Sequence, residues 1–89
     1  MSQVQQTSLD VYYNKVLPNL MRRQREVLRV FIDNQYRDFT NMELSVYLRW
    51  SINRVTPRVL ELRNKGLLVK YCRRRCGVTK NMALAWRLA

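Results

Sequence analysis

The chain has 89 residues and a net charge of +11, with 17 Lys and Arg against 6 Asp and Glu. This length allows one domain with one modest core. The sequence contains no histidine, two cysteines and two glycines. It therefore lacks a histidine general base, a Gly-rich phosphate loop and a complete zinc site. We expect a protein that is not an enzyme and has neither a cofactor nor a metal site.

The N-terminal stretch MSQVQQTSLD is polar, with neither a basic start nor an apolar segment. It therefore differs from a secretory signal peptide. No apolar run in the chain approaches the roughly 20 residues that a membrane-spanning helix needs. We expect a cytoplasmic protein without a membrane partner.

The positive charge is concentrated in the second half of the chain. Residues 1–48 contain six Lys and Arg against five Asp and Glu, a net of +1, whereas residues 49–89 contain eleven against one, a net of +10. Thirteen of the seventeen cations are arginine, whose planar fork suits phosphates and guanine edges. This asymmetry predicts that the second half faces a polyanion. A merely solubilising surface is the alternative.

The N-terminal region predicts a short helix. Residues 1–7 are polar, and we expect a disordered tail there, before a single domain over residues 8–89. A helix is predicted over about 8–17, with Ser8 as its N-cap and Pro18 ending or kinking it. Its apolar stripe either packs on the domain or forms a homodimer: Tyr12, Tyr13, Val16 and Leu17.

A second helix is predicted from about Met21 to Asn34, and a third begins soon after it. The second helix has apolar residues at helical spacing on its inner side: Val27, Leu28, Phe31 and Ile32. The polar stretch DNQYRD then predicts a loop. Thr40 and Glu43 form a T-x-x-E capping box, which predicts a helix that begins at Asn41 and stops near residues 49–50.

The next helix extends towards Gly66, which would terminate it as a C′ glycine. Val55, Val59 and Leu62 lie on one face of this helix. Pro57 is a conflict, because proline inside a helix removes a backbone hydrogen bond. Either the helix begins late, with Thr56 as N-cap, or it begins at Ser51 and bends. We favour the second alternative, because Val55 then fits the core stripe.

After Gly66 the apolar period changes from helical to alternating, which predicts a β-hairpin over about 67–88. GVTKN has turn character, and Leu84, Trp86 and Leu88 share one face of the second strand. The predicted architecture is mainly α with a small β-hairpin. It is a winged helix-turn-helix, with a three-helix core, a two-stranded wing, an extra N-terminal helix and the helix-turn-helix at about 41–65.

Four segments carry a family resemblance: RQREVL, FTNMELSVYLRW, INRVTPRVLELRNKGLL and RRCGVTKNMALAWRL. They resemble small winged helix-turn-helix proteins of tailed phages and prophages over roughly residues 12–89, and the general pattern is shared with MarR-type repressors. The resemblance implies binding to double-stranded DNA. This sequence departs from the pattern at Arg49 and Lys80, where glycine is common, and at Ser51, where proline is common.

The second helix of a helix-turn-helix enters the major groove of DNA. Asn53 could read adenine, and Arg54 or Arg58 could read guanine. The wing cations would contact phosphates or the minor groove. The predicted DNA contacts are Arg49, Ser51, Asn53, Arg54, Thr56, Arg58, Arg73, Arg74, Arg75 and Lys80.

The cysteines of YCRRRCGVTK compete with its arginines for a role. On an extended strand Cys72 and Cys76 would be roughly 13 Å apart, which is too far for a disulfide. We expect both to pack at the base of the wing.

Three functions remain open from the sequence. The first is a sequence-specific, phage-type transcriptional regulator. The second is a phage-type inhibitor or adaptor that binds a host protein, and the third is non-specific binding of nucleic acid. Two residues of the DNA-facing helix fit the first function poorly. Glu61 would repel phosphate unless it is paired, and an outward Leu60 could mark a partner surface.

Overall fold

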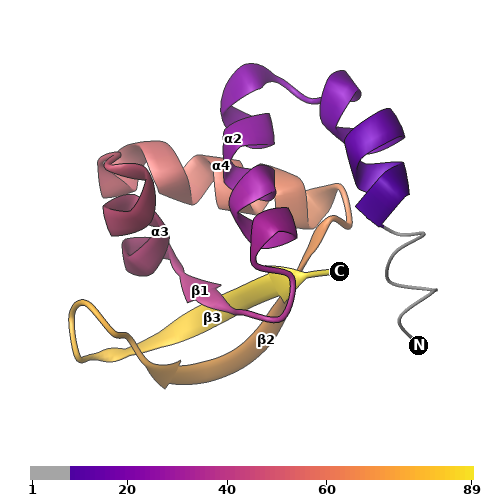
Figure 1. Cartoon of the computed structure of the whole chain (residues 1–89). Helices are drawn as coiled ribbons and strands as arrows, with labels where there is room; N and C mark the ends of the chain where they lie inside the picture. Colours follow the sequence, from indigo (N-terminus) through magenta and orange to yellow (C-terminus); the bar gives the residue numbers. More distant parts are fainter. Residues whose placement is uncertain (1–8) are drawn as a thin grey trace.

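The computed structural model describes residues 9–89, in which three helices lie on one side of a small antiparallel sheet (Figure 1). The predicted tail and the predicted cap at Ser8 lie outside the described residues. In chain order the elements are the π-helical turn η1 (Tyr12–Val16), the 3-10 turn η2 (Leu17–Asn19), α2 (Arg22–Asp33), β1 (Phe39–Thr40), α3 (Asn41–Leu48), α4 (Ile52–Asn64), β2 (Leu68–Arg75) and β3 (Met82–Leu88). The chain has the winged helix-turn-helix fold with an extra N-terminal helical segment.

The N-terminal segment is less regular than the helix predicted over 8–17. Residues 9–11 are α-helical, and the chain then continues as η1 and η2, with Pro18 in the first turn of η2. The Tyr12 hydroxyl donates to the Ala89 carbonyl at 3.1 Å, and Leu17 is buried in the core. Tyr12 and Leu17 of the apolar stripe therefore pack on the domain itself, whereas Tyr13 is 43% exposed.

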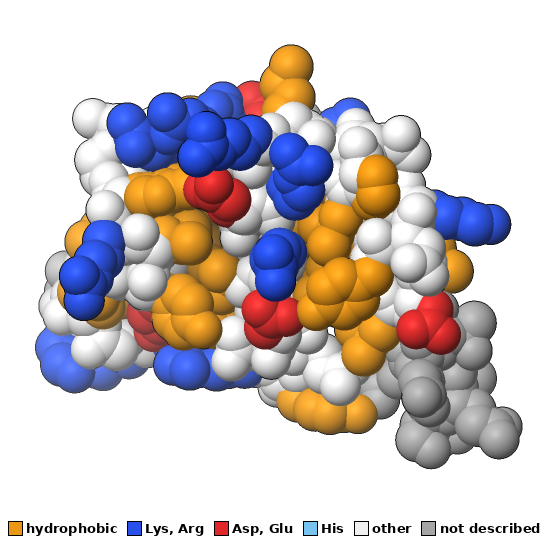
Figure 2. Space-filling model, turned by 45° about the horizontal axis from the view of Figure 1, so that its top comes forward, with side chains coloured by type: hydrophobic (Ala, Val, Ile, Leu, Met, Phe, Trp, Pro, Cys, Tyr) orange, Lys and Arg blue, Asp and Glu red, His pale blue; other side chains and the backbone are white. Residues whose placement is uncertain are grey.

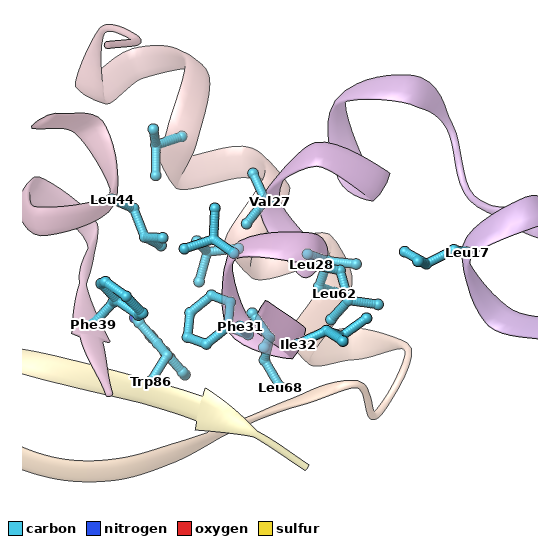
Figure 3. Packing of buried hydrophobic residues seen from close by; sticks show 13 residues of the cluster. Leu17, Val27, Leu28, Phe31, Ile32, Phe39, Leu44, Leu62, Leu68 and Trp86 are labelled. Atoms are coloured by element: carbon cyan, nitrogen blue, oxygen red, sulfur yellow. The ribbon is translucent and has the colours of Figure 1, made fainter. Parts of the chain in front are cut away.

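Helix α2 supplies the centre of the core (Figure 3). The four residues predicted on its inner side are all buried: Val27, Leu28, Phe31 and Ile32. Phe31 meets Phe39 edge-to-face, with ring centroids 5.4 Å apart. Leu44, Leu62, Leu68 and Trp86 close the cluster from the other elements. Each helix thus buries one stripe against α2 or the sheet.

The sheet has three strands: the predicted two-stranded wing, β2 and β3, and one short strand, β1, that the sequence analysis did not predict. β1 pairs with β3 through Phe39–Trp86 and Thr40–Ala85, which gives the strand order β1-β3-β2. A two-residue strand is too short to show an alternating pattern in the sequence. Burial is uneven along the face predicted for Leu84, Trp86 and Leu88, because Leu84 is 43% exposed while Trp86 is 8% exposed. The hairpin extends past the core at this point (Figure 1).

The helix-turn-helix begins with the predicted capping box. The Glu43 N–H donates to Thr40 Oγ1 at 3.1 Å, and Glu43 Oε1 accepts from the Thr40 N–H at 3.0 Å. Helix α3 then ends at Arg49, which has φ 59° and lets the Trp50 N–H bond to the Ser45 carbonyl. Helices commonly end with such a left-handed residue.

Helix α4 begins at Ile52, with Ser51 in the N-cap position. The Ser51 carbonyl accepts from the N–H groups of Arg54 and Val55. Pro57 lies inside the helix, so the early start is confirmed and the late start at Thr56 is wrong. Gly66, with φ 77°, ends the α4 segment in a Schellman arrangement. The Gly66 N–H bonds to the Arg63 carbonyl, and the Leu67 N–H bonds to the Leu62 carbonyl.

Two described non-glycine residues have positive φ: Arg49 at 59° and Lys80 at 68°. A left-handed conformation costs a residue with a Cβ roughly 1–2 kcal/mol. Glycine avoids this cost but loses more backbone entropy on folding. We expect Arg49→Gly and Lys80→Gly each to raise the free energy of unfolding by about 0.5–1 kcal/mol, or Tm by about 4 °C. Thermal unfolding followed by circular dichroism measures this. Gly66→Ala is the control and should lower Tm; if Tm fell in both glycine variants, the strain would not exist.

Candidate nucleic-acid interface

Helix α4 has one buried face and one outward face. Val55, Val59 and Leu62 are buried, as predicted. The outward face has a stripe at spacings of four, three and four residues: Asn53, Pro57, Leu60 and Asn64. We call this set the outward stripe. It contains no charged side chain, and Leu60 is 51% exposed within it.

Arg54 and Arg58 lie on the side of α4 that faces α2. The Arg54 guanidinium lies over the Trp50 ring, 6.0 Å from its centroid. Arg58 Nη2 donates to Glu61 Oε2 at 2.8 Å, and Glu61 Oε1 accepts from Gln24 of α2 at 2.9 Å. The hydrogen bonds from Gln24 and Arg58 lower the pKa of Glu61. Glu61 is thus paired, and Arg58 neutralises it instead of pointing outward.

The other side of α4 faces α3 and the sheet. Asn41, the first residue of α3, donates to Thr56 Oγ1 at 3.4 Å. The Arg63 guanidinium lies over Trp86 of β3, 5.6 Å from the ring centroid. The prediction did not include Arg63. The sequence offered one signal for Arg63. It directly follows the buried Leu62, so the helical rotation of one residue turns it to the side of α4 nearest the wing.

The three arginines of the wing have two different environments. Arg73 and Arg75 are exposed, whereas Arg74 is half-buried. Arg74 Nε donates to Asp38 Oδ2 at 2.8 Å, and its Nη2 donates to Glu43 Oε1 at 2.7 Å. Alternation along β2 causes the difference, since neighbouring side chains point to opposite faces. Arg74 is therefore held inside the domain.

Glu43 is the centre of this arrangement, which we call the clamp: Asp38, Glu43, Arg74 and the Gly77 N–H. Glu43 Oε2 accepts from Arg74 Nη1 at 2.8 Å and from the Gly77 N–H at 2.7 Å. A Cβ on Gly77 would lie 3.0 Å from Glu43 Oε2, so this close approach favours glycine. The hydrogen bonds from Arg74, followed by those from the Gly77 and Thr40 N–H groups, lower the pKa of Glu43 to about 2 despite burial. The clamp fixes the wing turn against the start of α3.

Both cysteines are free thiols. Cys76 is buried where the wing turn begins, and its Sγ lies 3.1 Å from Thr40 Oγ1. Burial raises the pKa of the Cys76 thiol. Hydrogen bonds from Thr40 and from the Thr79 and Val78 N–H groups outweigh this effect and lower the pKa to about 7. Cys72 Sγ points to Asp38 Oδ2, 3.8 Å away. Among the described residues, no group of three His, Cys, Asp or Glu side chains could hold a metal ion.

The remaining cations surround α4 and the wing turn. Within residues 9–89, no acidic side chain pairs with Arg49, Arg54, Arg73, Arg75 or Lys80. Arg75 and Lys80 instead donate to backbone carbonyls of the turn, Lys80 and Gly77 respectively. Figure 2 shows Lys and Arg side chains around the upper, left and lower edges of this view and also near its centre and right, with hydrophobic side chains between them.

A basic notch lies beside the turn between α3 and α4. It has a volume of about 300 Å³ and is lined by Arg22, Arg23, Glu26, Trp50 and Arg54. Arg23 lies over the same Trp50 ring as Arg54, 5.9 Å from its centroid. The prediction missed the α2 arginines, because residues 1–48 are nearly neutral overall. Only the packing of α2 against the turn brings them to this side.

Comparisons with known proteins show the fold. No family model matches the sequence, and no curated protein matches it. A solved structure described as a possible transcriptional regulator from Methanosarcina mazei Go1 is similar, with a TM-score of 0.68 and 19% sequence identity. The match covers 84% of this chain and 61% of that one, so this chain spans less than two thirds of its length. In the described part of the chain, no helix is both long and apolar enough to span a membrane.

Acid titration tests the clamp. The folded pKa of Glu43, about 2, lies below its ordinary value of 4.5. The stability that it contributes is therefore complete above about pH 5 and is lost as the pH falls towards 2. We expect Arg74→Gln to lower the free energy of unfolding by about 2–3 kcal/mol at pH 7, and to flatten its decline between pH 5 and 2. Urea unfolding at several pH values measures both effects.

Arg22→Gln is the matched control, because its ion pair with Glu26 is exposed, with 86% and 42% of the two side chains accessible. Such pairs contribute little to stability. An Arg74→Gln variant with the wild-type pH profile would mean that Glu43 does not depend on this partner.

Proposed function

We propose that this chain binds double-stranded DNA as a transcriptional regulator, with α4 in the major groove and the wing on the phosphate backbone. One observation carries the proposal. Within residues 9–89 no acidic side chain pairs with the cations beside α4 and at the wing turn that were named above, whereas the four ion pairs in those residues involve Arg22, Arg58 and Arg74. Unpaired arginines on both sides of an exposed helix suit the two phosphate strands that border a major groove.

Backbone conformation supports the same proposal. Arg49 and Lys80 are the described non-glycine residues with positive φ, and both carry a positive charge beside α4 or at the wing turn. Glycine would adopt these conformations at lower cost. A cation kept in a strained turn has a physical rationale if it contacts an anion there.

The proposed contact set differs from the one that the sequence suggested. Arg58 and Arg74 leave it, because Glu61 and the clamp hold their guanidinium groups. The retained contacts are Arg49, Ser51, Asn53, Arg54, Thr56, Arg73, Arg75 and Lys80. If its five cations contact phosphates, the slope of log K against log salt is on the order of −4 to −5. The relation to phage regulators rests on the sequence motifs alone.

A second candidate is the inhibitor or adaptor that binds a host protein. The outer face of α3 favours it, because Val46 and Tyr47 are 58% and 51% exposed beside Val78 of the wing turn, which is 41% exposed. Neighbouring exposed apolar side chains are typical of protein contacts. Homodimerisation through Tyr12, Tyr13, Val16 and Leu17 is not part of either proposal, since Tyr12 and Leu17 pack on their own domain.

Gel-shift titration against random and genomic duplexes tests the main proposal. We expect the double variant Arg73→Ala, Arg75→Ala to weaken binding to all duplexes alike and to reduce the salt slope by about 2, because it removes two phosphate contacts. The control is Lys15→Ala with Arg29→Ala, which removes two exposed cations from η1 and α2. Equal losses in both double variants would mean that only net charge matters. Absence of duplex binding at low salt would leave the protein-binding candidate.

A further inference from the structure

We infer that α4 reads A·T base pairs, with Leu60 and Pro57 contacting thymine methyl groups and Asn53 binding adenine. This inference rests on the proposed function and names the class of DNA site. It starts from the outward stripe, the part of α4 that would lie deepest in the major groove. The stripe contains two uncharged amides and two apolar side chains, and Leu60 is half exposed.

The arginines that could read guanine are held to the sides of this stripe. Arg58 is paired with Glu61 at 2.8 Å. The guanidinium groups of Arg54 and Arg63 lie over Trp50 and Trp86, at 6.0 and 5.6 Å from the ring centroids. Arginine on guanine is the commonest specific contact in the major groove, and it requires a guanidinium that points at the base edge. Here the guanidinium groups flank the stripe, where phosphates would lie.

The chemistry of the stripe matches one kind of base pair. Thymine is the base whose major-groove edge carries a methyl group, and apolar side chains contact it there. Asparagine can bind the N6 and N7 atoms of adenine with two hydrogen bonds. Within residues 9–89 no side-chain hydrogen bond engages Asn53 or Asn64, so both amides are available.

The positive charge on both sides of the outward stripe distinguishes between a protein helix and a DNA duplex as its binding partner. An apolar protein helix would bury Leu60 equally well, but it would leave the cations on both sides without counter-charges. A duplex supplies both groups: methyl groups at the bottom of the groove and phosphates at its edges. The flanking arginines therefore favour DNA as the occupant.

The test is a double-mutant cycle between the protein and the DNA. The preferred site is selected from random duplexes with the wild-type protein, and its thymines are then replaced one at a time by deoxyuridine, which removes only the methyl group. We expect an A·T-containing site and a loss of about fourfold in affinity at the critical thymine, as for one methyl group removed from an apolar contact. In Leu60→Ala the same replacement should change affinity less than about twofold, because the partner of the methyl group is gone.

Val69→Ala is the matched control. Val69 is 45% exposed but lines a separate groove with Leu9 and Tyr12, and this variant should keep the full effect of deoxyuridine. Three results would overturn the inference and leave duplex binding intact. They are a selected site of G·C pairs, binding without sequence preference, and equal deoxyuridine effects in wild type and Leu60→Ala. Failure of the wild type to bind any duplex would overturn the proposed function as well.

Discussion

The carboxylate of Glu43 joins the start of α3, strand β2 and the wing turn at one point. It closes the capping box with Thr40, pairs with Arg74 of β2 and accepts the N–H of Gly77 in the wing turn. One half-buried anion therefore sets where α3 begins and where the wing lies relative to it. The strong lowering of its pKa is the expected consequence of several donors converging on one carboxylate.

Three acidic residues of this basic chain hold arginines in fixed positions. Asp38 and Glu43 hold Arg74, and Glu61 holds Arg58. These pairs fix the wing and the contact between α4 and α2, and they leave the other cations of the second half exposed. The outward stripe of α4 consists of uncharged residues, and the nearest guanidinium groups lie beside it, over Trp50 and Trp86 or on Glu61.

Most of the fold follows from local signals in the sequence. The capping box at Thr40, the apolar periods of α2 and α4 and the glycine at position 66 each specify an element through its own residues. The parts that sequence reasoning missed lack such a signal. Strand β1 has two residues and forms by pairing with β3. Leu84 continues the alternating apolar pattern of β3, but the hairpin extends past the core at this residue and leaves it exposed.

The sequence by itself determined the winged helix-turn-helix, the basic second half and the set of arginines from which contacts are chosen. Only the tertiary structure decided that Arg74 is held, whereas Arg58 pairs locally with Glu61 three residues along the same helix. Arg74 meets Glu43 across 31 positions of the chain, and Glu61 meets Gln24 across 37. Neighbouring residues such as Arg73 and Arg74 look alike in sequence. They differ because strand alternation turns one to solvent and the other to carboxylates supplied by distant segments.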